Sequence, residues 1–192
     1  LGVARTQQAQ QRSALALALI LTLAACQSSE ERAEDHYQAA LALLEEGDLE
    51  RATVEFRNVF QLNGLHVDAR RTFAQALRDD GDMSQAYSQF LRLAEQLPTD
   101  AMARLELSEM AIEVQNWEQL NLHGARLLEL APEALRTGEE GTRIEIIAVT
   151  LAYAQAIEDE DNSARRDAAD RAETLLEEVP GNLGLYRVLV DN

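Results

Sequence analysis

The sequence predicts an all-α protein built from paired helices, because helix-forming residues dominate it, helix breakers are scarce and its motifs recur at a fixed spacing. Ala contributes 31 of the 192 residues and Leu 30, against only 3 Pro and 9 Gly. This composition favours helices and excludes a β-sandwich, a β-barrel or a disordered tail. Aromatic residues make up 5% of the chain, so the core must consist mainly of closely packed Ala and Leu.

The charge balance is strongly acidic. The chain has 34 Asp and Glu against 17 basic residues, all of them Arg, and a formal net charge of −17. Nucleic-acid binding is excluded because it needs many cations to displace counterions from phosphates. The absence of Lys from the sequence excludes Schiff-base chemistry and the phosphate-binding lysine of a Walker loop. An acidic surface either keeps the protein soluble or attracts a basic partner, and the sequence leaves both interpretations open.

The N-terminal 25 residues have the pattern of an export signal. They contain Arg5 and Arg12 but no acid, and residues 14–25 are apolar apart from Thr22. A helix over residues 14–25 would span about 18 Å, which is less than the roughly 30 Å hydrocarbon core of a bilayer. We therefore predict a leader at 1–25 rather than a membrane-spanning helix.

The leader ends in Leu23-Ala24-Ala25-Cys26, which resembles the lipobox of bacterial lipoproteins. The resemblance implies cleavage before Cys26, acylation of that residue and anchoring to a membrane. Gln27 in the next position implies the outer membrane, and 26–32 is predicted to be a polar tether. The alternative is an uncleaved leader that holds the chain at the inner membrane.

A 34-residue period follows the leader. A Gly-Asp pair, then Ala and then Phe recur at matching places in residues 47–56 and 81–90, and Pro98 and Pro132 are also 34 apart. Gly suits the left-handed residue that ends a helix, Asp caps the next helix, and Pro terminates the unit. In the third copy Gln115-Asn116 replaces Gly-Asp.

This pattern resembles the tetratricopeptide repeat, a 34-residue helix–turn–helix unit. The resemblance implies a solenoid with a right-handed superhelix and repeats at 33–66, 67–100 and 101–134. The aromatic residue expected early in each first helix is replaced by His36, Arg70 and Arg104.

Residues 135–182 are predicted to form a linker and a divergent fourth repeat. We expect a linker at 135–141, helices at 142–157 and 164–179, and a polar turn at 158–163. Residues 183–192 read as the start of a further helix, as expected for an N-terminal piece of a longer protein. A short capping helix is the alternative.

No residue pattern predicts catalysis. His36, His66 and His123 are too far apart in sequence to form a metal-ligand pair on one helical face. The acidic stretch at 158–162 lacks the Gly and Glu that a calcium loop requires, so it is interpreted as a solvated turn. We predict no enzyme activity, no cofactor and no metal.

The repeat resemblance implies a concave groove lined by successive first helices. Two Arg beside Gln75 favour an extended peptide with an acidic group near its centre and apolar side chains around it. The candidate partner-binding residues are Tyr37, Leu41, Arg71, Gln75, Arg78, Leu105 and Glu109.

Together these patterns predict a lipid-anchored adaptor on the periplasmic face of the outer membrane, with a protein or peptide in its groove. Lipoproteins with such repeats serve pilus assembly, outer-membrane barrel assembly and exopolysaccharide export. Residues 55–64 are most similar to the repeat lipoproteins associated with exosortases. The alternative is an interaction module at the front of a larger envelope enzyme whose catalytic domain lies beyond residue 192.

Overall fold

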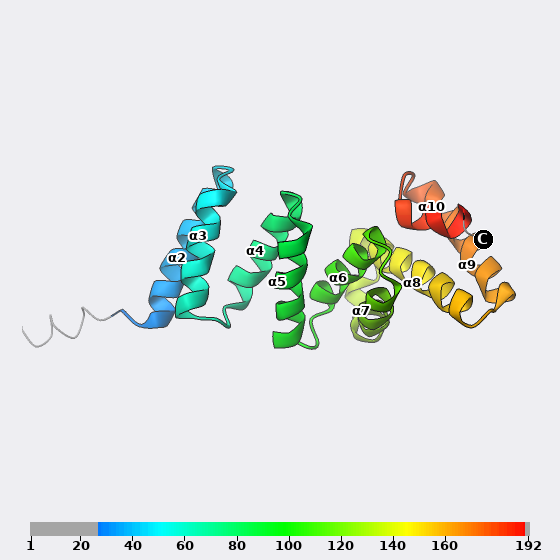
Figure 1. The fold of residues 1–192 in the computed structure, drawn as a ribbon, viewed down its shortest axis with the longest axis horizontal. Coiled ribbons are helices and arrows are strands. Elements are labelled where there is room, and N and C mark those ends of the chain that lie inside the picture. The colour runs from blue at the N-terminus through cyan, green and yellow to red at the C-terminus, as the bar shows by residue number, and fades with distance from the viewer. Residues whose placement is uncertain (1–26, 191–192) are drawn as a thin grey trace, which may run out of the picture. The chain divides into compact units, whose positions relative to one another are not determined.

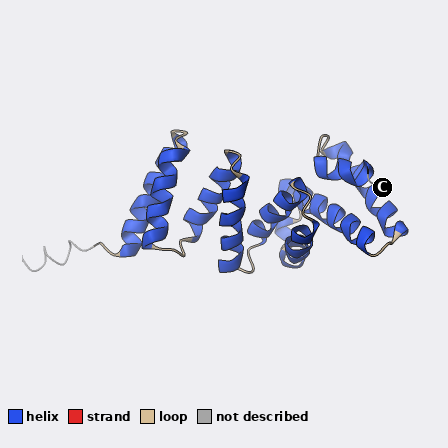
Figure 2. Ribbon diagram, viewed as in Figure 1, coloured by secondary structure: helices blue, strands red, loops and turns tan. Residues whose placement is uncertain are grey.

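In the computed structural model, residues 27–190 are described, and they form α-helices, one short 3-10 helix and no strand (Figure 2). The predicted leader and Cys26 lie outside the described residues. In chain order the helices are α2 (Ser29–Glu45), α3 (Leu49–Leu62), α4 (Val67–Asp79), α5 (Met83–Gln96), α6 (Ala101–Glu113), α7 (Trp117–Leu130), η1 (Glu133–Leu135), α8 (Gly138–Glu158), α9 (Asn162–Glu178) and α10 (Leu183–Val190). The all-α prediction is confirmed.

The chain divides into two compact units between Ala69 and Arg70, inside α4. In the first unit, α2 and α3 pack side by side (Figure 1). Their closest contacts are at small residues, since Ala40 and Ala52 are fully buried, and Phe56 fills the space beside them. In the second unit, α5 packs on α6, α6 on α7, α7 on α8, α8 on α9, and α9 on α10.

The turn inside each helix pair has the predicted chemistry. Gly47 and Gly81 have φ of 76° and 86°, in the left-handed region where a side chain would add strain. Asp48 and Asp82 then cap the second helices by accepting hydrogen bonds from backbone N–H groups three residues later. In the third pair, Gln115 takes the left-handed conformation with φ of 57°.

Two predicted segment boundaries are wrong. The tether expected at 26–32 is shorter, because α2 begins at Ser29: Ser28 and Glu31 form a reciprocal capping box that starts the helix there. The linker expected at 135–141 is also shorter, because α8 begins at Gly138.

The α7–α8 junction, between the third and fourth helix pairs, departs from the earlier packing because α8 approaches α7 closely. Gly124 stands where the earlier repeats have Phe56 and Phe90, and a Cβ there would lie 3.2 Å from Cγ2 of Ile147. Ile147 and Leu151 of α8 are buried in the same core cluster as Leu120 and Leu127 of α7. The space of the missing aromatic ring is therefore filled from the next helix.

Three polar pairs replace the aromatic packing expected in each first helix. His36 contacts Glu55 at 2.5 Å, Arg70 donates to Gln89 at 2.9 Å, and Arg104 contacts Nδ1 of His123 at 2.7 Å. Each pair joins residues 19 apart, so the same two repeat positions meet three times. We call these contacts the cross-helix pairs.

The third cross-helix pair contains a buried neutral histidine. His123 is 1% exposed, and its Nε2 has no hydrogen-bond partner among the described residues. Burial and the neighbouring Arg104 charge lower the pKa of His123 to about 4. A free histidine titrates near pH 6.5. Between that pH and about 4, the unfolded chain therefore has a protonated His123 and the folded chain does not.

We therefore expect folding stability to fall as the pH drops from about 6.5 towards about 4, by up to about 1.4 kcal/mol per pH unit from this residue. His123→Gln keeps a polar partner for Arg104 but cannot be protonated, so its stability should depend less on pH across this range. Thermal unfolding of both proteins from pH 7.5 downwards measures the difference. Parallel pH profiles would contradict the assignment.

Candidate functional site

The first unit holds Tyr37 and Leu41 of the predicted groove, both on α2. The Tyr37 ring lies against His66, with centroids 5.0 Å apart, and 6.4 Å from Phe56. Both residues are partly buried. Tyr37 therefore also contributes to the packing of α2 against α3 and the loop that follows it.

Arg71 and Gln75, on α4, both have partners within the chain. Arg71 is ion-paired with Asp100, which also accepts a hydrogen bond from Ala103 N at 3.0 Å and so caps α6. Burial opposes ionisation of Asp100, but the hydrogen bonds from Arg71 and the helix terminus outweigh it and lower its pKa. The exposed Gln75 donates to Asp79 at 2.8 Å.

Arg78 and Glu109 belong to an ionic cluster that joins three first helices. Arg78 of α4 pairs with Glu106, with Glu109 at 3.0 Å and with Glu113 at 3.3 Å, all on α6. Arg143 of α8 reaches Glu109 at 2.6 Å and Glu106 at 2.8 Å. We call these five residues the charge network.

Four members of the charge network are mostly shielded from solvent, whereas Glu113 is 47% exposed, and the two Arg of the network face three Glu. The side chains of Arg78 and Glu106 are 17% and 8% exposed. Burial opposes the ionised form of Glu109, yet hydrogen bonds and charge from Arg143 and Arg78 outweigh it and lower its pKa. The stabilisation from ionised Glu109 is therefore present above the ordinary pKa of a glutamate and is lost as the pH falls through the lowered value.

These contacts change the chemistry expected of the predicted groove. Arg71 and Arg78, two of the predicted partner-binding residues, are already paired with carboxylates of the same chain. Leu105 is fully buried, so it cannot serve as an apolar contact for a ligand. The sequence alone could not reveal this pairing, because the partners of both Arg lie 28 or more residues away in the chain.

The candidate list of the sequence analysis contains Arg78 and Glu109 but not the other three members of the charge network, Glu106, Glu113 and Arg143. Arg143 follows Glu109 by 34 residues, so the repeat period continues across η1 into α8. Extending the period past Pro132 would have identified Arg143. Glu106 offered no such signal, because it does not occupy a groove position of the repeat.

The far end of the predicted groove is bounded by α10. Arg187 donates to the carbonyl of Ile112 at 2.7 Å, at the C-terminal end of α6. A cavity of about 400 Å³ lies between these elements, with Arg78 and Glu109 on its wall. This part of the first-helix face is therefore covered by the chain itself.

A larger groove of about 670 Å³ lies on the side formed by the second helices, between α5 and the α6–α7 turn. We call it the α5–α7 groove. Val114 is 71% exposed and Met83 40% exposed, and Tyr87 donates to Gln119 at 2.7 Å. Its lining residues are Met83, Ser84, Tyr87, Ser88, Leu91, Met110, Ala111, Glu113, Val114, Asn116 and Gln119.

Within residues 27–190, no group of His, Cys, Asp and Glu side chains is arranged to hold a metal ion. Within the acidic stretch at 158–162, residues 159–161 form the turn between α8 and α9, and Asp161 caps α9 through Ser163 N and Ala164 N. None of the helices in the described range combines the length and hydrophobicity needed to cross a bilayer.

Stacked helix pairs with this turn chemistry define a tetratricopeptide-like repeat fold. Solved structures share this fold, among them two of MamA. MamA (41-end) from Desulfovibrio magneticus RS-1 matches with a TM-score of 0.53 and 20% identity, over 78% of this chain and 77% of that one. The RS-1 MamA ArsTM double mutant matches with a TM-score of 0.54 and 18% identity, over 93% and 94%. No protein family and no curated protein matches the sequence.

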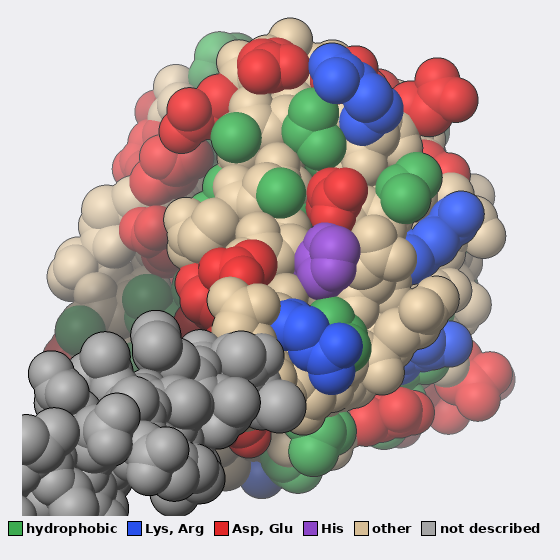
Figure 3. Space-filling model, turned by 90° about the vertical axis from the view of Figure 1, so that its left-hand side faces the viewer, with side chains coloured by type: hydrophobic (Ala, Val, Ile, Leu, Met, Phe, Trp, Pro, Cys, Tyr) green, Lys and Arg blue, Asp and Glu red, His purple; other side chains and the backbone are tan. Residues whose placement is uncertain are grey.

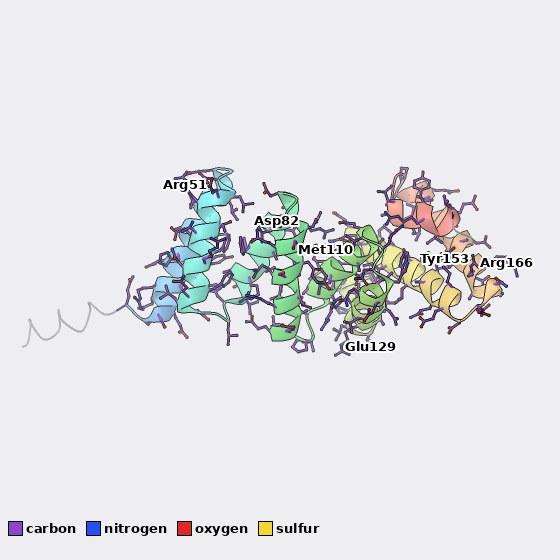
Figure 4. The ribbon with its side chains drawn as sticks, in the orientation of Figure 1. Arg51, Asp82, Met110, Glu129, Tyr153 and Arg166 are labelled. Carbon is purple, nitrogen blue, oxygen red and sulfur yellow. The ribbon has the colours of Figure 1, made fainter. Side chains whose placement is uncertain are left out.

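The charge network predicts a large effect of removing Arg143. Arg143→Met leaves Glu106 and Glu109 short of a cation in a largely buried setting, so we expect a loss of about 3 kcal/mol in unfolding free energy. Arg166→Met, at an exposed position on α9 (Figure 4), should change the unfolding free energy by less than about 0.5 kcal/mol. Urea unfolding of both variants measures this, and equal effects would contradict a structural role for the network.

Proposed function

We propose that this chain is a scaffold that binds a protein partner at the surface of its repeat array. The observation that carries the proposal is the α5–α7 groove, which is open while the neighbouring face of first helices is closed by the charge network and α10. Stacked helix pairs position such grooves on a rigid frame, which lowers the entropy cost of binding. The tetratricopeptide-like fold supports the same role.

We further propose that the scaffold is exported and held at the cell envelope by acyl chains on Cys26, at the periplasmic face of the outer membrane. The apolar leader and the Leu23–Cys26 pattern support this location. Because several acyl chains anchor far more firmly than one, the groove would be presented to its partner at a high local concentration. The system served would be an envelope assembly or export machine.

Photocrosslinking in the producing cell tests the scaffold. A crosslinking amino acid is placed at Val114 in the α5–α7 groove, at Gln75 in the predicted groove of first helices, and at Arg166 as a control. We expect one envelope protein to be captured from a groove position and not from Arg166. The absence of any adduct from both grooves, or the same adducts from all three positions, would contradict the proposal.

The anchor is tested by Cys26→Ser. If Cys26 is acylated after cleavage of the leader, the substitution abolishes labelling by a fatty-acid analogue and leaves a precursor of higher mass. Membrane fractionation and gel mobility of both proteins measure this. Unchanged localisation and mass would instead indicate an uncleaved leader.

A further inference from the structure

We propose that the α5–α7 groove takes a cationic amphipathic helix of the partner, with aliphatic side chains in the groove and Lys or Arg at its rim. This inference rests on the proposed scaffold function and specifies the chemistry of its ligand. Three observations lead to it: an apolar wall, an acidic rim and the absence of a β-strand edge in the lining.

The apolar wall suits a short helix. Met83, Tyr87 and Leu91 follow one another at intervals of four along α5 and extend over roughly 12 Å, about two helical turns. Met110 lies on the neighbouring α6 (Figure 4) and Val114 at its end. Met side chains adapt to irregular apolar surfaces. Aliphatic side chains spaced along one face of a partner helix would pack against this wall.

The segments that form the groove carry acids and no base. Residues 79–91 and 110–121 contain no Arg, Lys or His. The nearest preceding base, Arg78, is already held in the charge network. The acids on these two segments are Asp79, Asp80, Asp82, Glu113 and Glu118. Of these, Glu113 lies in the groove lining and is also paired with Arg78, and Asp80 and Asp82 come just before the lining residue Met83 in the chain. We call Asp80, Asp82 and Glu113 the acidic rim.

This acidic rim selects the charge of the occupant. Lys or Arg flanking an apolar stripe would face carboxylates across the rim, whereas an acidic peptide would be repelled. A second copy of this chain is disfavoured for the same reason, since each copy carries a formal net charge of −17. Figure 3 shows another face of the molecule, on which hydrophobic side chains are scattered singly among charged ones, outside the grey atoms.

The lining also selects the conformation of the occupant. Its walls are helices, whose backbone groups are paired internally, so the groove offers side chains and no strand edge. An amphipathic helix pairs its own backbone groups and needs only side-chain contacts, so it suits this surface better than a strand that requires an edge.

The test uses the full chain with an acylation-free Cys26→Ser background and a defined probe. The probe is a fluorescent amphipathic helix of Leu and Lys, about 14 residues or four turns long. A peptide with Glu in place of Lys and a scrambled Leu/Lys peptide serve as probe controls. Fluorescence anisotropy gives the dissociation constants.

Two matched pairs of variants locate the binding. Val114→Glu places a carboxylate in the groove, and Ile157→Glu places one at another exposed apolar position, on α8 and outside the groove lining. Asp80→Lys reverses a rim charge, and Glu173→Lys reverses an exposed charge on α9. Circular dichroism verifies that all four variants keep their helical content.

We expect the Leu/Lys helix to bind, and the Glu and scrambled peptides to bind at least about tenfold more weakly. Val114→Glu and Asp80→Lys should each weaken binding about tenfold, which corresponds to about 1.4 kcal/mol. Ile157→Glu and Glu173→Lys should change it less than about twofold. Equal effects within a matched pair, equal binding of the Glu peptide, or no binding of the Leu/Lys helix would overturn the inference.

The two proposals fail differently. If crosslinking captures a partner from Gln75 but the Leu/Lys helix ignores the α5–α7 groove, the scaffold stands and the ligand assignment falls. A crosslink from Val114 to a second copy of this chain would likewise overturn the ligand assignment. If no partner is captured from either groove, the scaffold itself is refuted, whatever the peptide does.

Discussion

The turn that closes each helix pair is the constraint on which the rest of the structure depends. A left-handed residue ends the first helix, and a capping Asp or Asn starts the second immediately afterwards, as at Gly47-Asp48, Gly81-Asp82 and Gln115-Asn116. This arrangement sets the crossing of the two helices, so equivalent side chains return every 34 residues. The three cross-helix pairs are the direct result, because two repeat positions 19 apart meet in every copy.

The same register decides which surface remains for a partner. First helices of successive repeats lie close enough for Arg78 and Arg143 to share Glu109 between them. The charges of Arg78, Arg143, Glu106 and Glu109 would be exposed on an isolated helix pair. In the array they pair with one another, so they stabilise it and are no longer free to bind a ligand. On the side of the second helices, the spacing between α5 and the α6–α7 turn is not filled by side chains, and a groove remains.

The junction between α7 and α8 shows how the array tolerates a change of packing. Gly124 removes the aromatic ring that the earlier repeats place between helices, and α8 moves in so that Ile147 and Leu151 occupy the core. The 34-residue offset still joins Glu109 to Arg143 across this change. The ionic contacts between successive first helices thus continue at this junction, although the apolar contacts are made by different residues.

The sequence by itself determined the local structure: the all-α class, the turns at Gly47 and Gly81 and the caps at Asp48 and Asp82. These features depend on residues within one helix turn of each other, so composition and spacing suffice to predict them. It could not determine that Arg71 meets Asp100, that Arg78 meets Glu106, or that Leu105 is buried. Those outcomes depend on how one repeat packs on the next, and only the tertiary structure decides which of many nearby carboxylates each guanidinium reaches.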